Sequence, residues 1–215
     1  MRAIRLILLA GLSVAAISDA VCAAQGAEFG FGADTNVFVR ALVAETRHEE
    51  GPGLLPADRA YIRAGTNKFA FLIPTGLKLE NWGDGRVALV NRDYSRKITF
   101  RIVGPPEPGG IEADSESWFH KVTAEHPQAK LIKAFSAFAD SCRGPAYEIS
   151  FVESASVRRG QVAFIPCRVA VVEFSLVCGP EDFEAARQQL NTILLTLRSS
   201  DPNGELHISP LSDKL

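Results

Sequence analysis

The sequence predicts an α+β fold in which a curved antiparallel sheet packs against helices, as an α/β/α sandwich with a closing C-terminal amphipathic helix. Short apolar segments that alternate with polar residues recur between turns rich in proline and glycine, which is typical of antiparallel strands. One stretch with helical spacing, around residue 118, lies between them. The longest periodic segment, residues 183–197, is an amphipathic helix that needs an apolar sheet to cover its hydrophobic side.

The chain begins with the pattern of a secretory signal peptide. Arg2 and Arg5 precede an apolar run over residues 6–17, and small residues follow. The run is shorter than the roughly 20 residues of a membrane-spanning helix. We therefore expect residues 1–24 to be removed on export, which leaves a periplasmic or secreted protein that is not transmembrane after processing.

Cys22 leaves lipidation of the mature N-terminus open. A bacterial lipoprotein keeps a lipidated cysteine as its first residue, with a small residue before it and usually a leucine further back. Val21 and Asp19 occupy those positions here. Val21-Cys22-Ala23 fits a cleavage site, and a cut after Ala24 or close to Ala27 fits almost as well, so we expect Cys22 to be removed with the signal peptide.

Residues 25–62 are interpreted as an N-terminal extension. Within them, residues 36–44 fit a strand or a short helix equally well, and residues 48–58 form a connector rich in glycine and proline. The compact domain is expected over residues 63–200, followed by a polar tail over residues 201–215.

The strands of this domain are recognised by alternation between turns. In the segment KITFRIV, the side chains of Ile98, Phe100 and Ile102 share one face, which is typical of a half-buried strand. Pro166 marks a break, because proline cannot donate to a strand ladder. Strands are predicted over residues 68–73, 87–90, 97–103, 129–133, 147–152, 161–165 and 169–177.

Two helices are predicted. The first spans residues 114–125, with Trp118 and Val122 one turn apart on the same side, and Pro127 ends it. The second follows Pro180, which suits a first helical turn. Its apolar residues recur at three- and four-residue spacing: Phe183, Ala186, Leu190, Ile193, Leu194 and Leu197.

Cysteine content predicts one disulfide. Once Cys22 is removed, Cys142, Cys167 and Cys178 remain, and an odd number in an oxidising compartment suggests one bridge and one spare thiol. If the last three strands form an antiparallel meander, Cys142 and Cys167 lie toward one end of the sheet and Cys178 toward the other. We therefore predict a bridge between Cys142 and Cys167; three buried thiols are the alternative.

The order of these elements resembles the PsbP/Mog-type α/β/α sandwich superfamily, in its bacterial envelope branch. The resemblance covers about residues 63–200 and depends on the early strand that runs into Pro74-Thr75-Gly76, the helix around Trp118, and the closing unit VVEFSLVC, GPEDF and LLTLRSS. It implies a non-catalytic protein that binds or positions partners in the cell envelope or, in photosynthetic organisms, supports the oxygen-evolving complex. The family's tryptophan after the Pro-x-Gly turn is replaced here by Leu77. No metal or photosystem-contact motif has a counterpart, so a photosynthetic role is not carried over.

Composition excludes nucleic acid as a partner. The chain has 215 residues, with 23 basic and 25 acidic side chains and a net charge of −2. A phosphate-binding surface needs a clustered basic excess, whereas basic residues occur here at most in pairs such as Arg158-Arg159.

Enzyme motifs are missing from the sequence. It has no G-x-S-x-G, H-E-x-x-H or C-x-x-C pattern and no phosphate-binding glycine loop. Among its four histidines, His120 and His126 share one helical stretch but lie about 120° apart around the axis, so they cannot readily hold one ion. We expect no metal site, no catalytic residues and no cofactor.

Trp82 and Tyr94 are the candidate partner-binding residues. Each lies in a predicted loop, where a large side chain has no strand or helix face to bury it. Exposed aromatic residues in loops often anchor partners, because they offer a large rigid contact area. The alternative is that both side chains fold back over the edge of the core.

The sequence therefore predicts an exported, non-catalytic binding or accessory protein of the cell envelope that acts through surface contacts with an envelope protein or an apolar ligand. Two alternatives stay open. A chaperone-like protein would hold apolar segments or lipids in a groove between sheet and helix. A hydrolase without a linear motif would show a pocket with convergent titratable groups.

Overall fold

The structure is a computed structural model that describes residues 42–50, 56–105, 115–139, 142–201 and 203–208. The expected signal peptide and Cys22 lie outside these residues. No helix in the described ranges is long and apolar enough to span a bilayer.

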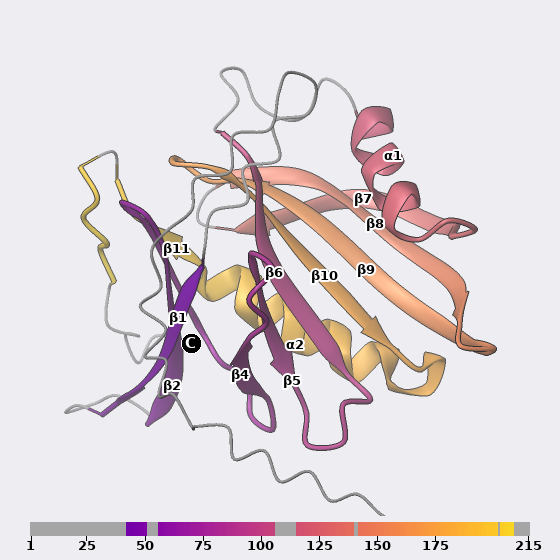
Figure 1. Ribbon diagram of the computed structural model, residues 1–215, viewed down its shortest axis with the longest axis horizontal. Coiled ribbons are helices and arrows are strands. Elements are labelled where there is room, and N and C mark those ends of the chain that lie inside the picture. The colour runs from indigo at the N-terminus through magenta and orange to yellow at the C-terminus, as the bar shows by residue number, and fades with distance from the viewer. Residues whose placement is uncertain (1–41, 51–55, 106–114, 140–141, 202, 209–215) are drawn as a thin grey trace, which may run out of the picture. The chain divides into compact units, whose positions relative to one another are not determined.

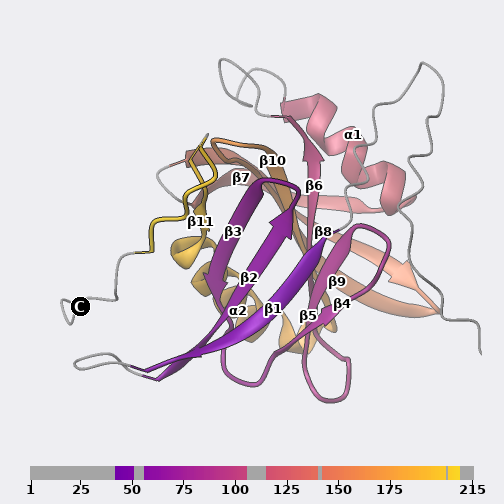
Figure 2. The same cartoon turned by 60° about the vertical axis from the view of Figure 1, so that its left-hand side comes forward.

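Two antiparallel sheets make up most of the described chain (Figures 1 and 2). The small sheet has the order β1-β2-β3-β11, with β1 at Val43–Glu49, β2 at Ala57–Ala64, β3 at Asn67–Leu72 and β11 at Arg198–Ser199. The large sheet has the order β4-β5-β6-β10-β9-β8-β7. Its strands are β4 (Lys78–Asn81), β5 (Arg86–Val90), β6 (Lys97–Gly104), β7 (Lys130–Ala139), β8 (Cys142–Glu153), β9 (Ser156–Pro166) and β10 (Val171–Cys178).

The predicted α+β class with antiparallel pairing is confirmed, but the prediction of a single sheet is wrong, because the described strands form two. Helix α1 (Ser115–Glu125) lies on one face of the large sheet (Figure 1). Helix α2 (Phe183–Thr196) follows a short 3-10 turn, η2 (Pro180–Asp182), and lies on the other face. The large sheet is thus covered differently on its two sides.

Alternation along β10 separates two apolar layers. Phe174 and Leu176 join the larger layer, which the small sheet and α2 share with the large sheet. Val171 and Val177 point to the opposite face and join a smaller layer beneath α1. In the larger layer the ring centroids of Phe100 and Phe174 are 5.3 Å apart, and both rings contact residues of β3. Packing of apolar side chains in this layer holds the two sheets together.

Several elements differ from the predicted ones. The expected N-terminal extension, residues 25–62, contains β1 and most of β2, and the expected boundary at residue 63 falls inside β2. Strand β1 gave no signal because an edge strand exposed at most positions carries polar residues on both faces. The strand predicted over residues 129–133 continues to Ala139, where it pairs with β8.

Candidate functional site

The structure brings Trp82 and Tyr94, which come from two different loops, to one cluster beside β4. Trp82 directly follows β4, and Tyr94 lies in the loop between β5 and β6. Their exposed fractions are 40% and 57%, so neither side chain is absorbed by the core. With Lys78, Glu80 and Lys97 they form what we call the aromatic patch.

Glu80 is the centre of the aromatic patch. Its carboxylate oxygen Oε1 accepts a hydrogen bond from the Tyr94 hydroxyl at 2.9 Å and lies 2.6 Å from Lys78 Nζ. The same ammonium lies 4.9 Å from the centroid of the Tyr94 ring. Hydrogen bonds from Lys78 and Tyr94 lower the pKa of Glu80, and Glu80 in turn raises the pKa of Lys78. Both groups therefore stay charged at neutral pH.

Lys97 extends the patch to the indole. Its Nζ lies 5.2 Å from the centroid of the Trp82 ring, within the range of a cation–π interaction. The patch thus offers two aromatic rings, each with an ammonium group beside it. Such rings provide contact area, while the ammonium groups and Glu80 provide polar partners at the rim.

The backbone at Tyr94 is strained. Its φ of 59° lies in the left-handed region, where a bulky residue is rarely found. The loop fixes this conformation through a hydrogen bond from Tyr94 N–H to Asn91 C=O at 3.1 Å and another from Arg96 N–H to Asn91 Oδ1 at 2.9 Å. Strain of this kind costs roughly 1–3 kcal/mol and tends to occur at functional sites. It is consistent with a requirement for this side chain rather than for a small turn residue.

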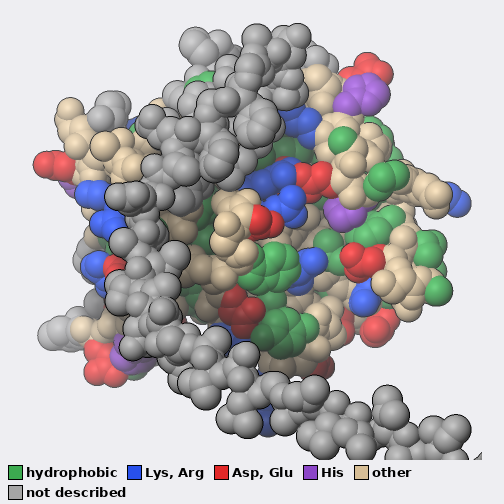
Figure 3. Space-filling model, viewed as in Figure 1, with side chains coloured by type: hydrophobic (Ala, Val, Ile, Leu, Met, Phe, Trp, Pro, Cys, Tyr) green, Lys and Arg blue, Asp and Glu red, His purple; other side chains and the backbone are tan. Residues whose placement is uncertain are grey.

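A separate cluster of charged side chains lies on the face of the large sheet that α1 covers. Arg101 contacts Glu173 at 2.6 Å and also Glu125 at the end of α1. Burial outweighs the attraction of Arg101 and raises the pKa of Glu173, which is 3% exposed. Figure 3 shows basic, acidic and hydrophobic side chains next to one another over the central strands of this face.

His120 and His126 lie in different surroundings. His120 is exposed on α1, whereas the His126 ring lies 4.3 Å from the ring of Phe151. Burial lowers the pKa of His126. A different trio, Asp201, Glu205 and His207, has ligand atoms within 4.8 Å of one another. The Asp201 carboxylate there accepts backbone N–H groups and closes a turn.

The two cysteines of the predicted disulfide lie at strand ends: Cys142 begins β8, and Cys167 directly follows β9. Strand β9 pairs with both β8 and β10, as the predicted meander requires, and the register places Cys142 and Cys167 at the same end of the β8–β9 pair. Cys178 pairs with Arg159 near the opposite end. None of the three cysteines that the structure describes is in a disulfide bond.

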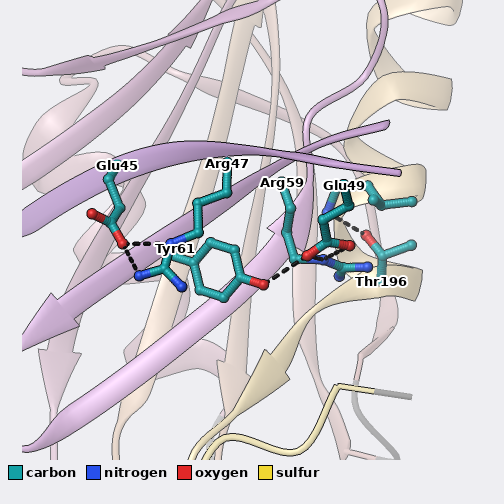
Figure 4. A network of polar contacts seen from close by, with 7 residues as sticks. Glu45, Arg47, Glu49, Arg59, Tyr61 and Thr196 are labelled. Carbon is teal, nitrogen blue, oxygen red and sulfur yellow. Dashed lines mark hydrogen bonds and ion pairs between the residues drawn. The ribbon is translucent and has the colours of Figure 1, made fainter. Parts of the chain in front are cut away.

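A cleft that no sequence pattern indicates lies on the outward face of the small sheet. It has a volume of about 600 Å³, and β1, β2, β3 and the segment after β11 line it. Figure 4 shows the polar network along one wall. Arg47 Nε donates to Glu45 at 2.8 Å, and the guanidinium lies 4.5 Å from the centroid of the Tyr61 ring. The Tyr61 ring therefore packs against the guanidinium of Arg47.

The network continues beyond the cleft. The Tyr61 hydroxyl donates to Glu49 at 2.6 Å, and the buried Arg59 donates from Nε to the same carboxylate at 2.9 Å. Burial opposes ionisation of Glu49, but the hydrogen bonds from Tyr61 and Arg59 outweigh it and lower the pKa of Glu49. Every charge in this part of the wall is thus matched by an opposite one.

Two solved structures are similar to this chain over most of its length. PsbP from the cyanobacterium Synechocystis sp. PCC 6803 is 13% identical over 77% of this chain and 96% of its own, with a TM-score of 0.42. LpqN, which is involved in cell envelope biogenesis of Mycobacterium tuberculosis, is 11% identical over 74% of this chain and 91% of its own, with a TM-score of 0.46. No protein-family model matches the sequence, and no curated protein matches it either.

Proposed function

We propose that this chain is an exported, non-catalytic accessory protein of the cell envelope, built on an α/β/α sandwich, that binds a partner protein through the aromatic patch. The observation that carries the proposal is that two exposed aromatic side chains lie beside β4: Tyr94 donates a hydrogen bond to Glu80 on that strand, and Trp82 directly follows the strand. Aromatic residues ordered before binding lose little conformational entropy when a partner covers them.

The chemistry of the patch supports binding rather than catalysis. It contains no serine, cysteine or histidine, and its carboxylate, Glu80, is already paired with Lys78. A hydrolase would need a nucleophile next to a base. The chaperone-like alternative requires an apolar groove between sheet and helix, but buried side chains of both elements fill the contact between α2 and the large sheet.

Photo-crosslinking of the mature protein in an envelope extract tests the proposal. A photoreactive residue at Arg92, in the same exposed loop as Tyr94, should capture a partner, whereas one at Leu195 on α2, which is 71% exposed, should not. The double variant W82A/Y94G should abolish capture at position 92. The control V152A/V157A removes apolar side chains that are 64% and 57% exposed and should leave capture intact. Equal capture at both positions, or capture that survives W82A/Y94G, would refute the proposal.

Export also predicts an oxidised cysteine pair. We propose that Cys142 and Cys167 form a disulfide in an oxidising compartment, which the shared end of β8 and β9 supports. Peptide mapping of the protein from the envelope without reduction should find these two cysteines linked and Cys178 unlinked. A linked Cys178 would contradict the pairing.

A further inference from the structure

The cleft on the small sheet carries an excess of positive charge. Three cationic side chains line it, Arg47, Arg63 and Lys68, against one carboxylate, that of Glu45. Arg47 is paired with Glu45, so these two charges cancel. The side chains of Arg63 and Lys68 make no ion pair or hydrogen bond with another described residue. The excess is local, because the whole chain has a net charge of −2.

Arg63 and Lys68 are directly opposite each other. They are register partners on β2 and β3, and both side chains are exposed on the outward face. Like charges at directly opposite positions of an antiparallel pair are destabilising. An anion between them would remove this repulsion, and a guanidinium offers a phosphate or carboxylate two parallel N–H donors.

Apolar side chains line another part of the cleft, next to the two cations. Val43, which is 53% exposed, lies directly opposite Arg63 on β1. Leu206 and Ile208, both half-buried, line the cleft from the segment after β11. The volume of about 600 Å³ is in the range of sites for small organic ligands.

We propose that this cleft binds an anionic amphiphile. Its phosphate or carboxylate head lies between Arg63 and Lys68, and its apolar chain lies against Val43, Leu206 and Ile208. The Tyr61 ring, held by Arg47 and Glu49, forms a rigid wall of the site. This site is on the small sheet and is independent of the partner surface proposed for the aromatic patch.

Isothermal titration of the mature protein with octyl phosphate tests the site. The variant R63Q/K68Q should weaken binding by roughly tenfold or more, because it removes both positive charges that face the head group. The control R92Q/K130Q removes the same charge at exposed positions outside the cleft and should bind within about twofold of the wild type, since distant exposed charges are screened. Removing a repulsive pair should leave the unfolding temperature of R63Q/K68Q unchanged or raised, so the variant is expected to fold.

Three further probes define the chemical class. Octanoate should bind the wild type with a similar loss in R63Q/K68Q, because the head is recognised by charge. Octyl glucoside, which has a neutral head, and inorganic phosphate, which has no chain, should each bind about tenfold more weakly than octyl phosphate. Binding of octyl phosphate that is unaffected by R63Q/K68Q would overturn the proposal. Equal affinity for octyl glucoside would exclude recognition of the head, and equal affinity for inorganic phosphate would exclude recognition of the chain.

Discussion

The two faces of the large sheet are covered to different extents. On one face, α2 and the small sheet together seal an apolar layer in which Phe183 and Leu190 are fully buried. On the other face, α1 covers the β8 and β9 side, and the aromatic patch beside β4 stays partly exposed. One face therefore maintains the fold, while the other leaves charged and aromatic side chains available for contacts.

The largest effect is expected on the sealed face. Leu190→Ala should lower the free energy of unfolding by about 2–5 kcal/mol, because it opens a cavity in a layer enclosed by three elements. Chemical denaturation followed by circular dichroism measures this change. Val122→Ala, on α1, is the comparison for the other face and should cost about 1.6 kcal/mol for the two methyl groups removed. Equal losses of unfolding free energy at both positions would mean that the two faces contribute equally to stability.

The pH dependence of stability tests Glu173, which lies on the face that α1 covers in part. Its pKa is raised in the folded protein, so folding favours the protonated carboxyl, and the stabilising effect of protonation is lost as the pH rises from the ordinary value of 4.5 through the raised value. Glu173→Gln mimics the protonated form. The variant should therefore be at least as stable as the wild type at neutral pH and lose that advantage below pH 4.5. A denaturation series across this range would contradict the assignment if the variant were less stable at neutral pH.

The smallest effect is expected at Tyr94. Tyr94→Gly relieves the left-handed backbone strain but makes the unfolded chain more flexible, so the free energy of unfolding should stay within about 1 kcal/mol of the wild type. Thermal unfolding monitored by calorimetry provides the measurement. A loss comparable to that of Leu190→Ala would mean that Tyr94 supports the fold rather than a contact surface.

Strands with regular alternation and helices with regular apolar spacing could be predicted from the sequence. The apolar face of the strand at residues 97–103 was read from Ile98 and Phe100, and both are buried. Strand β4 was missed because KLEN is too short and polar to give such a pattern. The loop position of Tyr94 was predicted, but its contact with Glu80 was not, because that residue lies on the missed strand.

The cleft could not be predicted for a different reason. Its charged pair, Arg63 and Lys68, is defined only by the register between β2 and β3, and single residues do not reveal register. Its remaining wall comes from Leu206 and Ile208, which lie in residues 201–215, the predicted polar tail. Sites assembled from several strands and a distant segment leave no linear signal.

The short strand β11 has a consequence for the order of assembly. It pairs with β3, although more than a hundred residues of sequence separate the two strands. A polypeptide that emerges from its N-terminus can therefore complete the small sheet only after Ser199 has been released, and contacts between such remote segments form slowly. The amphiphile cleft would be among the last features to mature, so a truncated product should lack it even when its earlier strands are intact.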